Sequence, residues 1–184
     1  MAVVAPEEER FARNTLIMAQ AVHESVQKLY DAGYKTVNPM MISFAIGIIS
    51  SFDKHYLIQG FIKKSHKTSW DSIKNKDEKF FLENAGDIFS ELPMENVNMF
   101  RDMFQLKDKQ GQPVISQALK NQLWDLFHAM VKISIKYVHK QRKPYSYMGQ
   151  SGMTNAYSVN FSDDVDLARH SKLWGVVLEF PPNC

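Results

Sequence analysis

The sequence predicts an all-α protein: a compact bundle of about five helices followed by an irregular C-terminal arm. Two long segments place apolar side chains at steps of three and four residues, the spacing of one helix face. The breaks between segments carry Asn, Pro and Gly, which cap or end helices. With 184 residues, of which 45% are hydrophobic, the chain has the length of one domain and can bury a sizeable core.

The first helix is expected over residues 6–31. Glu7, Glu8 and Glu9 stand in its first turn, where carboxylates interact favourably with the positive end of the helix dipole, and Gly33 ends it. Its inward face is expected to carry Phe11, Thr15, Met18, Val22, Val26 and Leu29.

A second helix is expected to begin at Asn38, the N-cap, with Pro39 at the first helical position. Residues 39–52 contain no charged side chain and are apolar all round, which favours a central helix buried on most sides, with a more polar continuation through Ile62. This stretch has 14 residues, fewer than the ~20 that span a bilayer, so no transmembrane segment is expected.

Two further helices are expected before the longest one. Trp70 begins a pattern that continues to Leu92 and stops at Pro93, and a short helix is expected over residues 95–105. The cluster at residues 108–113 contains Asp, Gly and Pro, which is typical of a turn.

The longest helix is expected over residues 116–143. One face carries Leu119, Leu123, Leu126, Met130, Ile133 and Tyr137, and Trp124, Phe127, Val131, Ile135 and Val138 widen it. A helix with so wide an apolar face must pack inside the bundle. Lys132, Lys136, Lys140 and Lys143 recur at steps of four, four and three, so they form a line on its polar side, which we call the lysine stripe.

The helical core is therefore assigned to residues 1–143, and residues 144–184 to a C-terminal arm that packs on the core or on a partner. The arm is rich in Tyr and Gly and has no helical period at its start. A short helix is expected from Ser162 to Lys172, with acidic residues first and basic residues last. A short strand-like segment is expected from Trp174 to Phe180.

Charge and cysteine content exclude several classes of protein. The net charge is only +2, so an anionic partner must be met by a local patch. Cys184 is the one cysteine, which excludes an internal disulfide framework and a Cys-rich zinc site. The N-terminal residues lack the basic and apolar regions of a secretory signal, so synthesis in a reducing, intracellular compartment is expected.

No motif predicts catalysis. The six histidines are scattered and make no zinc-type pair. The acidic cluster at residues 163–166 lacks the spacing of a calcium loop and fits a helix N-terminus better. In the segment 149–153, Met153 replaces the final glycine of a Gly-x-Ser-x-Gly motif. We expect a protein that is not an enzyme and needs no metal or cofactor.

Two groups of residues are candidates for binding. Basic side chains could contact an anionic partner, either nucleic acid or an acidic protein; they are Lys63, Lys64, Lys67, Lys132, Lys136, Lys140, Arg142 and Lys143. Aromatic and apolar side chains of the arm could contact a protein partner, or become core residues if the arm folds back; they are Tyr145, Tyr147, Trp174, Val176, Leu178 and Phe180.

The run from Trp70 to Ala85, with the segments 123–127 and 133–138, resembles small helical proteins encoded by nucleocytoplasmic large DNA viruses. That group mostly has no assigned activity. The resemblance covers roughly residues 55–143 and brings no catalytic residue with it. It implies a viral protein made in the host cytoplasm, and a minor capsid protein or other component of the virion.

Three functional hypotheses follow. The first is a non-enzymatic protein that contacts other viral structural proteins, or itself, within a virus particle. The second is an accessory protein that binds nucleic acid through the lysine stripe. The third is a viral regulator of a helical host protein, which would use an apolar groove near Met40, Met41 and Phe44.

Overall fold

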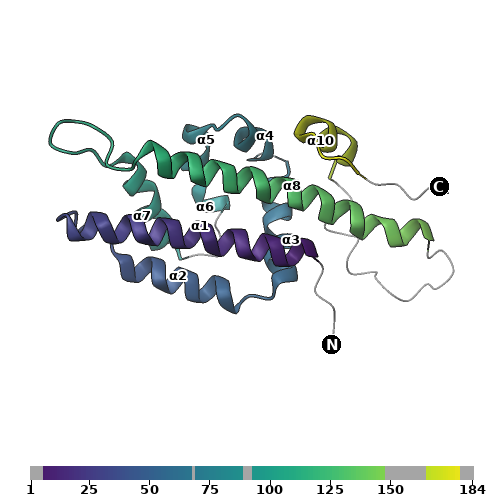
Figure 1. Cartoon of the computed structure of the whole chain (residues 1–184), viewed down its shortest axis with the longest axis horizontal. Helices are drawn as coiled ribbons and strands as arrows, with labels where there is room; N and C mark the ends of the chain where they lie inside the picture. The colour runs from purple at the N-terminus through teal and green to yellow at the C-terminus, as the bar shows by residue number, and fades with distance from the viewer. Residues whose placement is uncertain (1–5, 68, 89–92, 148–164, 179–184) are drawn as a thin grey trace.

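The computed structural model describes residues 6–67, 69–88, 93–147 and 165–178, and for residues 142–147 it describes the backbone alone. These residues form nine α-helices, as Figure 1 shows. In chain order they are α1 (Pro6–Asp31), α2 (Pro39–Ser51), α3 (Lys54–Ser65), α4 (Ser69–Lys74), α5 (Glu78–Glu83), α6 (Ala85–Ile88), α7 (Met94–Gln105), α8 (Gln117–Tyr147) and α10 (Leu167–Trp174). The all-α prediction is confirmed.

The two longest helices, α1 and α8, lie side by side and run in opposite directions (Figure 1). Helix α2 packs against the other side of α1, and α3 crosses α1 near its N-terminal end. Helix α4 packs against α8, α5 packs against α4, and α6 packs against α3, α5 and α7. Helix α7 also contacts α2, and α10 packs against α8 near its C-terminal half (Figure 1).

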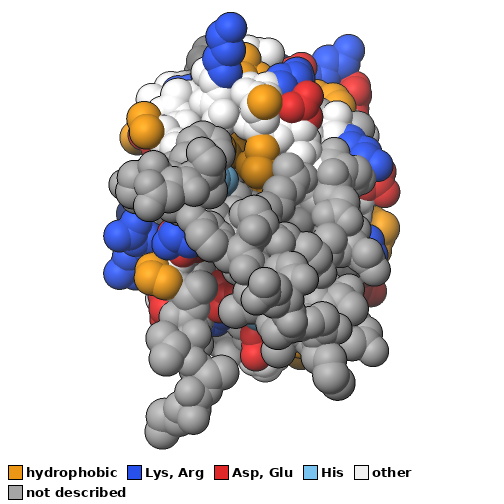
Figure 2. All heavy atoms as spheres, turned by 90° about the vertical axis from the view of Figure 1, so that its right-hand side faces the viewer, with side chains coloured by type: hydrophobic (Ala, Val, Ile, Leu, Met, Phe, Trp, Pro, Cys, Tyr) orange, Lys and Arg blue, Asp and Glu red, His pale blue; other side chains and the backbone are white. Residues whose placement is uncertain are grey.

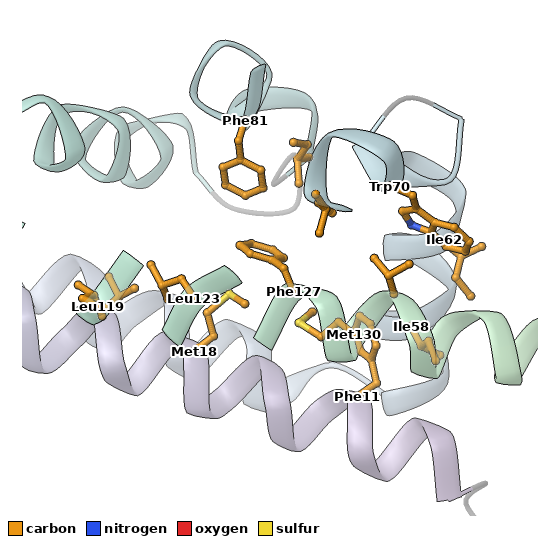
Figure 3. Close-up of a cluster of buried hydrophobic side chains, with 14 of the residues drawn as sticks. Phe11, Met18, Ile58, Ile62, Trp70, Phe81, Leu119, Leu123, Phe127 and Met130 are labelled. Atoms are coloured by element: carbon orange, nitrogen blue, oxygen red, sulfur yellow. The ribbon is translucent and has the colours of Figure 1, made fainter. Parts of the chain in front are cut away.

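The core lies between α1, α8 and the helices that cover them. Figure 3 shows how side chains from both long helices meet those of α3, α4 and α5. Its members include Phe11, Met18, Ile58, Ile62, Trp70, Phe81, Leu119, Leu123, Phe127 and Met130. The apolar face predicted for residues 116–143 is therefore the face that packs, and Val131, Ile135 and Val138 are fully enclosed.

The number of helices was predicted too low, because two of the expected helices are broken by capping residues. The helix expected from Pro39 to Ile62 divides at Asp53, whose carboxylate accepts a hydrogen bond from the His55 backbone N–H at 2.8 Å and starts α3. The pattern after Trp70 divides into α4, α5 and α6. Lys76 there has a positive φ of 53°, which a helix does not allow, and Asp77 caps α5.

The prediction that residues 39–52 form the central, mostly buried helix was wrong. Helix α2 lies at the edge of the bundle, where it packs on α1 and on α7. Its buried residues are Pro39, Ile42 and Ala45. On its outer face, Met40 is 78% exposed and Phe44 is 61% exposed. The centre of the bundle is instead the contact between α1 and α8.

The C-terminal helix was predicted correctly in kind, and the strand after it was not. Asp166 caps α10 by accepting from the Arg169 N–H at 3.0 Å, and Gly175 ends it with a φ of 62°. Trp174 is the last residue of this helix rather than the first of a strand. Within the described part of the chain, the only β-type pairing is an isolated bridge between Lys107 and Pro113.

None of the described helices combines the length and the apolar character that crossing a bilayer requires. At its other end, helix α8 continues through Pro144 to Tyr147, past the predicted division at residue 143. Tyr145 and Tyr147 therefore belong to the end of α8, and their side chains lie outside the described part of the structure.

A pair of substitutions tests this assignment of core and edge. Ile58 is fully buried, so Ile58→Ala is expected to lower the free energy of unfolding by about 2–5 kcal/mol through lost contacts and a cavity. Met40→Ala on the outer face of α2 is expected to change it by less than about 0.5 kcal/mol. Urea unfolding followed by circular dichroism measures both. Equal losses would mean that α2 is buried after all.

Candidate interaction surfaces

The outer face of α2 exposes two large apolar side chains, Met40 and Phe44, and carries no charge of its own. Met40, Phe44, Gly47 and Ser51 are all exposed and follow one another at steps of four, three and four residues, so they share one side of the helix. We call these four residues the α2 face. Because the helix contains no Asp, Glu, Lys or Arg, no charged side chain of α2 itself interrupts this face.

Polar contacts hold α2 in place. The Asn38 side chain accepts from the Met40 N–H at 3.0 Å and caps the helix. Asn96 of α7 donates to the carbonyl of Met41 at 2.9 Å. Ser43 Oγ lies 3.0 Å from the Nε2 atom of His23 on α1. The helix is therefore fixed to its neighbours, and its outer face is presented on a supported element.

The lysine stripe follows α8 as predicted, but one of its members is already engaged. Lys132, Lys136 and Lys140 are all exposed. The Nζ atom of Lys140 lies 2.7 Å from Oε1 of Glu7, a carboxylate residue that is only 5% exposed. Among the described residues, neither Lys132 nor Lys136 has a carboxylate within salt-bridge distance. The side chains of Arg142 and Lys143 lie outside the described structure.

The other predicted lysines belong to a different helix. Lys63 and Lys64 occupy the last turn of α3 and Lys67 follows it, where cations complement the negative end of the helix dipole. On the end of the molecule shown in Figure 2, the visible Lys and Arg side chains are interspersed with Asp and Glu rather than gathered in one area.

A polar cluster at the same end of the bundle was not predicted. Nδ1 of His55 lies 3.0 Å from Oε1 of Glu8 and 2.8 Å from the hydroxyl of Tyr137. Gln59 donates from Nε2 to the Tyr137 oxygen at 3.3 Å and lies 2.6 Å from the other ring nitrogen of His55. The cluster therefore joins α1, α3 and α8 through hydrogen bonds.

One sequence signal pointed to this cluster. Tyr137 stands on the apolar face of the longest helix, and a phenol hydroxyl there must find a partner. The partners come from residues 8, 55 and 59, which are too far from residue 137 in the chain for a local pattern to join them. Of the four residues in the cluster, only His55 and Gln59 are close in the sequence, four residues apart on one helix.

The cluster is suited to holding helices together. Burial raises the pKa of the Tyr137 hydroxyl far above its ordinary value, so this group stays protonated and remains a hydrogen-bond donor. A hydrogen on Nδ1 of His55 would face the Glu8 carboxylate, while Nε2 accepts from Gln59. In the part of the chain that is described, no group of three or more His, Cys, Asp or Glu residues could hold a metal ion.

The predicted anchors of the C-terminal arm pack on this chain's own helices. Trp174 and Val176 are buried, and Leu178 packs partly against the core. The ring of Trp174 meets that of His128 on α8 edge to face at 5.2 Å, and His170 meets Trp70 at 4.8 Å. Phe180 lies outside the described residues.

An open aromatic recess between α5, α7 and α8 was also not predicted. At its rim Lys120 and Glu78 form an ion pair at 2.8 Å. The rings of Phe81 and Phe127 pack against each other at 4.8 Å, so much of the lining is occupied by its own contacts.

No protein-family model, curated protein or solved structure matches this chain. The surfaces described above are therefore the basis for a functional proposal.

The ion pair of Lys140 with buried Glu7 can be tested against another lysine of the stripe. Lys140→Met leaves a buried carboxylate without its cation and is expected to lower the free energy of unfolding by about 1–3 kcal/mol. Lys136→Met, which breaks no described ion pair, is expected to change it by less than about 0.5 kcal/mol. Adding Glu7→Gln to Lys140→Met should recover part of the loss. Equal effects of the two lysine substitutions would contradict the pairing.

The docking of α10 is expected to weaken in acid. Burial, followed by the neighbouring Arg169 cation, lowers the pKa of His170 below 6.5, against a smaller opposing effect of Asp71 and Asp166. His66 lowers it further. Between the folded pKa and 6.5 the unfolded chain binds a proton at this position that the folded chain does not, so stability falls as the pH drops through that window.

The measurement is the free energy of unfolding as a function of pH, for the wild type and for His170→Gln. The glutamine variant cannot bind the proton, so its profile is expected to be flatter below pH 6.5. Hydrogen exchange of the α10 amides should show the same difference locally. Parallel profiles for the two proteins would exclude His170 as the titrating group.

Proposed function

We propose that this protein is a non-enzymatic helical protein that acts by protein–protein contact, as a minor structural component of a large DNA virus particle. The observation that carries the proposal is the α2 face. Water-exposed Met40 and Phe44 cost hydration free energy that burial against a partner would recover, at roughly 25 cal/mol per Å² of apolar surface.

Single exposed apolar side chains are common on monomeric proteins and need no partner. The α2 face differs because its apolar side chains share one side of a helix that contains no charged residue. Large exposed apolar patches mark interaction sites, and Met40 and Phe44 lie one helical turn apart on this face. The contacts of Asn38, Asn96 and His23 hold the helix in place, so a partner would not have to order it on binding.

The viral part of the proposal is supported by the resemblance of residues 55–143 to proteins of nucleocytoplasmic large DNA viruses. This resemblance implies that the partners are other viral structural proteins or a second copy of this chain. It also implies that the protein is located in the virion, after synthesis in the host cytoplasm. A supported apolar helix face is compatible with such a role, because shell proteins bind one another through surfaces that are buried only in the assembly.

The nucleic-acid alternative is supported by Lys132 and Lys136, which are exposed on one side of α8. Fewer lysines are available to contact phosphates than the sequence predicted, because Lys140 is paired with Glu7. Each cation that contacts a phosphate adds to affinity and to its salt dependence, so two lysines supply only a small part of a binding site.

A particle experiment tests the proposal. Mass spectrometry of purified particles should find peptides of this chain at a fixed ratio to the major capsid protein, both in intact particles and in genome-depleted shells. Phe44→Lys should reduce that ratio at least about tenfold, because a charge would be buried in an apolar contact. Tyr56→Lys, at a 70% exposed aromatic residue of α3, is the matched control and should be incorporated normally.

Each other outcome favours another hypothesis. Loss of the chain together with the genome would support nucleic-acid binding through the lysine stripe. Absence from particles would overturn the structural role and support an intracellular regulator. Circular dichroism of both lysine variants must show unchanged helix content, so that lost incorporation reports the surface and not the fold.

A further inference from the structure

The α2 face has large side chains at one end and small ones at the other. Met40 and Phe44 stand in the first half of the helix, and Gly47 and Ser51 in the second half. The spacing of the four residues, 4-3-4, reads the same in both directions. In an antiparallel pair whose two-fold axis lies level with the point between residues 45 and 46, residue 40 of one copy therefore stands level with residue 51 of the other, and residue 44 stands level with residue 47.

An antiparallel pair of α2 helices built on that axis matches large side chains with small ones. Phe44 of each copy lies opposite Gly47 of the other, and Met40 lies opposite Ser51. Nothing lies within 4 Å of where a Cβ of Gly47 would stand, so the surface is open at that point. Alternation of large and small residues across facing positions is what allows two helices to interdigitate.

The charge pattern also favours a second copy as the partner. In a two-fold contact each surface meets itself, so any charge near the axis meets its own like charge. Helix α2 contains none, so no charge of this helix opposes the approach of two copies. An acidic or basic partner helix would instead lose the hydration of its charges against an apolar surface that offers no counter-charge.

We propose that the α2 face binds a second copy of this chain in an antiparallel, two-fold α2–α2 contact, with Phe44 of each copy seated over Gly47 of the other. This inference rests on the proposed role in protein–protein contact and names the partner for the same surface. A 13-residue helix is about 20 Å long, so the contact is smaller than a standard stable interface and forms a weak dimer.

Disulfide trapping tests the orientation. In a chain carrying Cys184→Ser, to remove the other thiol, Met40→Cys and Ser51→Cys are made separately and then mixed. The antiparallel pair places residue 40 beside residue 51 of the other copy, so the mixture is expected to form a disulfide-linked dimer. Residues 40 of the two copies stand at opposite ends, about 16 Å apart along the helix, so Met40→Cys alone should not crosslink. A crosslink with Met40→Cys alone and none in the mixture would overturn the antiparallel contact.

Sedimentation velocity tests the role of Gly47. The wild type is expected to sediment faster as its concentration rises. Gly47→Gln fills the open position, so it should remain monomeric at every concentration while its melting temperature stays equal or rises, since Gln is a better helix former than Gly. Gly60→Gln on α3, which likewise has nothing within 4 Å of its Cβ position, is the control and should still dimerise. Unchanged dimerisation of Gly47→Gln, or a wild type that is monomeric throughout, would overturn the proposal.

These results separate this inference from the proposed function. If the wild type is monomeric but Phe44→Lys still fails to enter particles, the α2 face binds a different protein, and the proposed function survives without the dimer. If the wild type dimerises through α2 but Phe44→Lys enters particles normally, the dimer is correct and the particle role is wrong.

Discussion

The antiparallel contact between α1 and α8 is the packing on which the other helices depend. Helices of 26 and 31 residues are long enough to present a continuous apolar face, and every other described helix packs against one of them or against a helix that does. Helices α4, α5 and α6 have six residues or fewer. Such short helices are not stable alone in water, so α8 and the surrounding core must hold them.

The sequence predicts best where one face of a long helix decides the structure. The bounds of α1 were predicted as residues 6–31, because its apolar side chains recur over seven turns between clear signals at both ends. The division of the segment 39–62 was not predicted. Asp53 both caps a helix and fits a polar helix surface, and the choice between the two depends on the neighbouring helices rather than on local sequence.

The position of α2 shows why the interaction surface could not be predicted. A helix that is apolar all round has the same sequence pattern whether its own bundle or another protein covers it. Hydrophobicity predicts that a side chain is buried, but it does not predict which surface buries it. The polar cluster was not predicted for another reason. Glu8, His55 and Tyr137 are far apart in the sequence and come together only after folding. Lys132, Lys136 and Lys140 of the lysine stripe are exposed on α8, but the buried carboxylate that engages Lys140 lies at the other end of the core sequence.

The three carboxylates that open α1 each contact a basic side chain that is made later. Glu8 contacts His55 and Glu9 contacts Lys54, whereas Glu7 contacts Lys140, about 130 residues further on. At a translation rate of about 5–20 residues per second, roughly 7–27 s separate the synthesis of Glu7 and Lys140. During that interval the apolar face of α1, with Phe11 and Val26, has no α8 to cover it. The central packing of the bundle can therefore form only after the last long helix has been made.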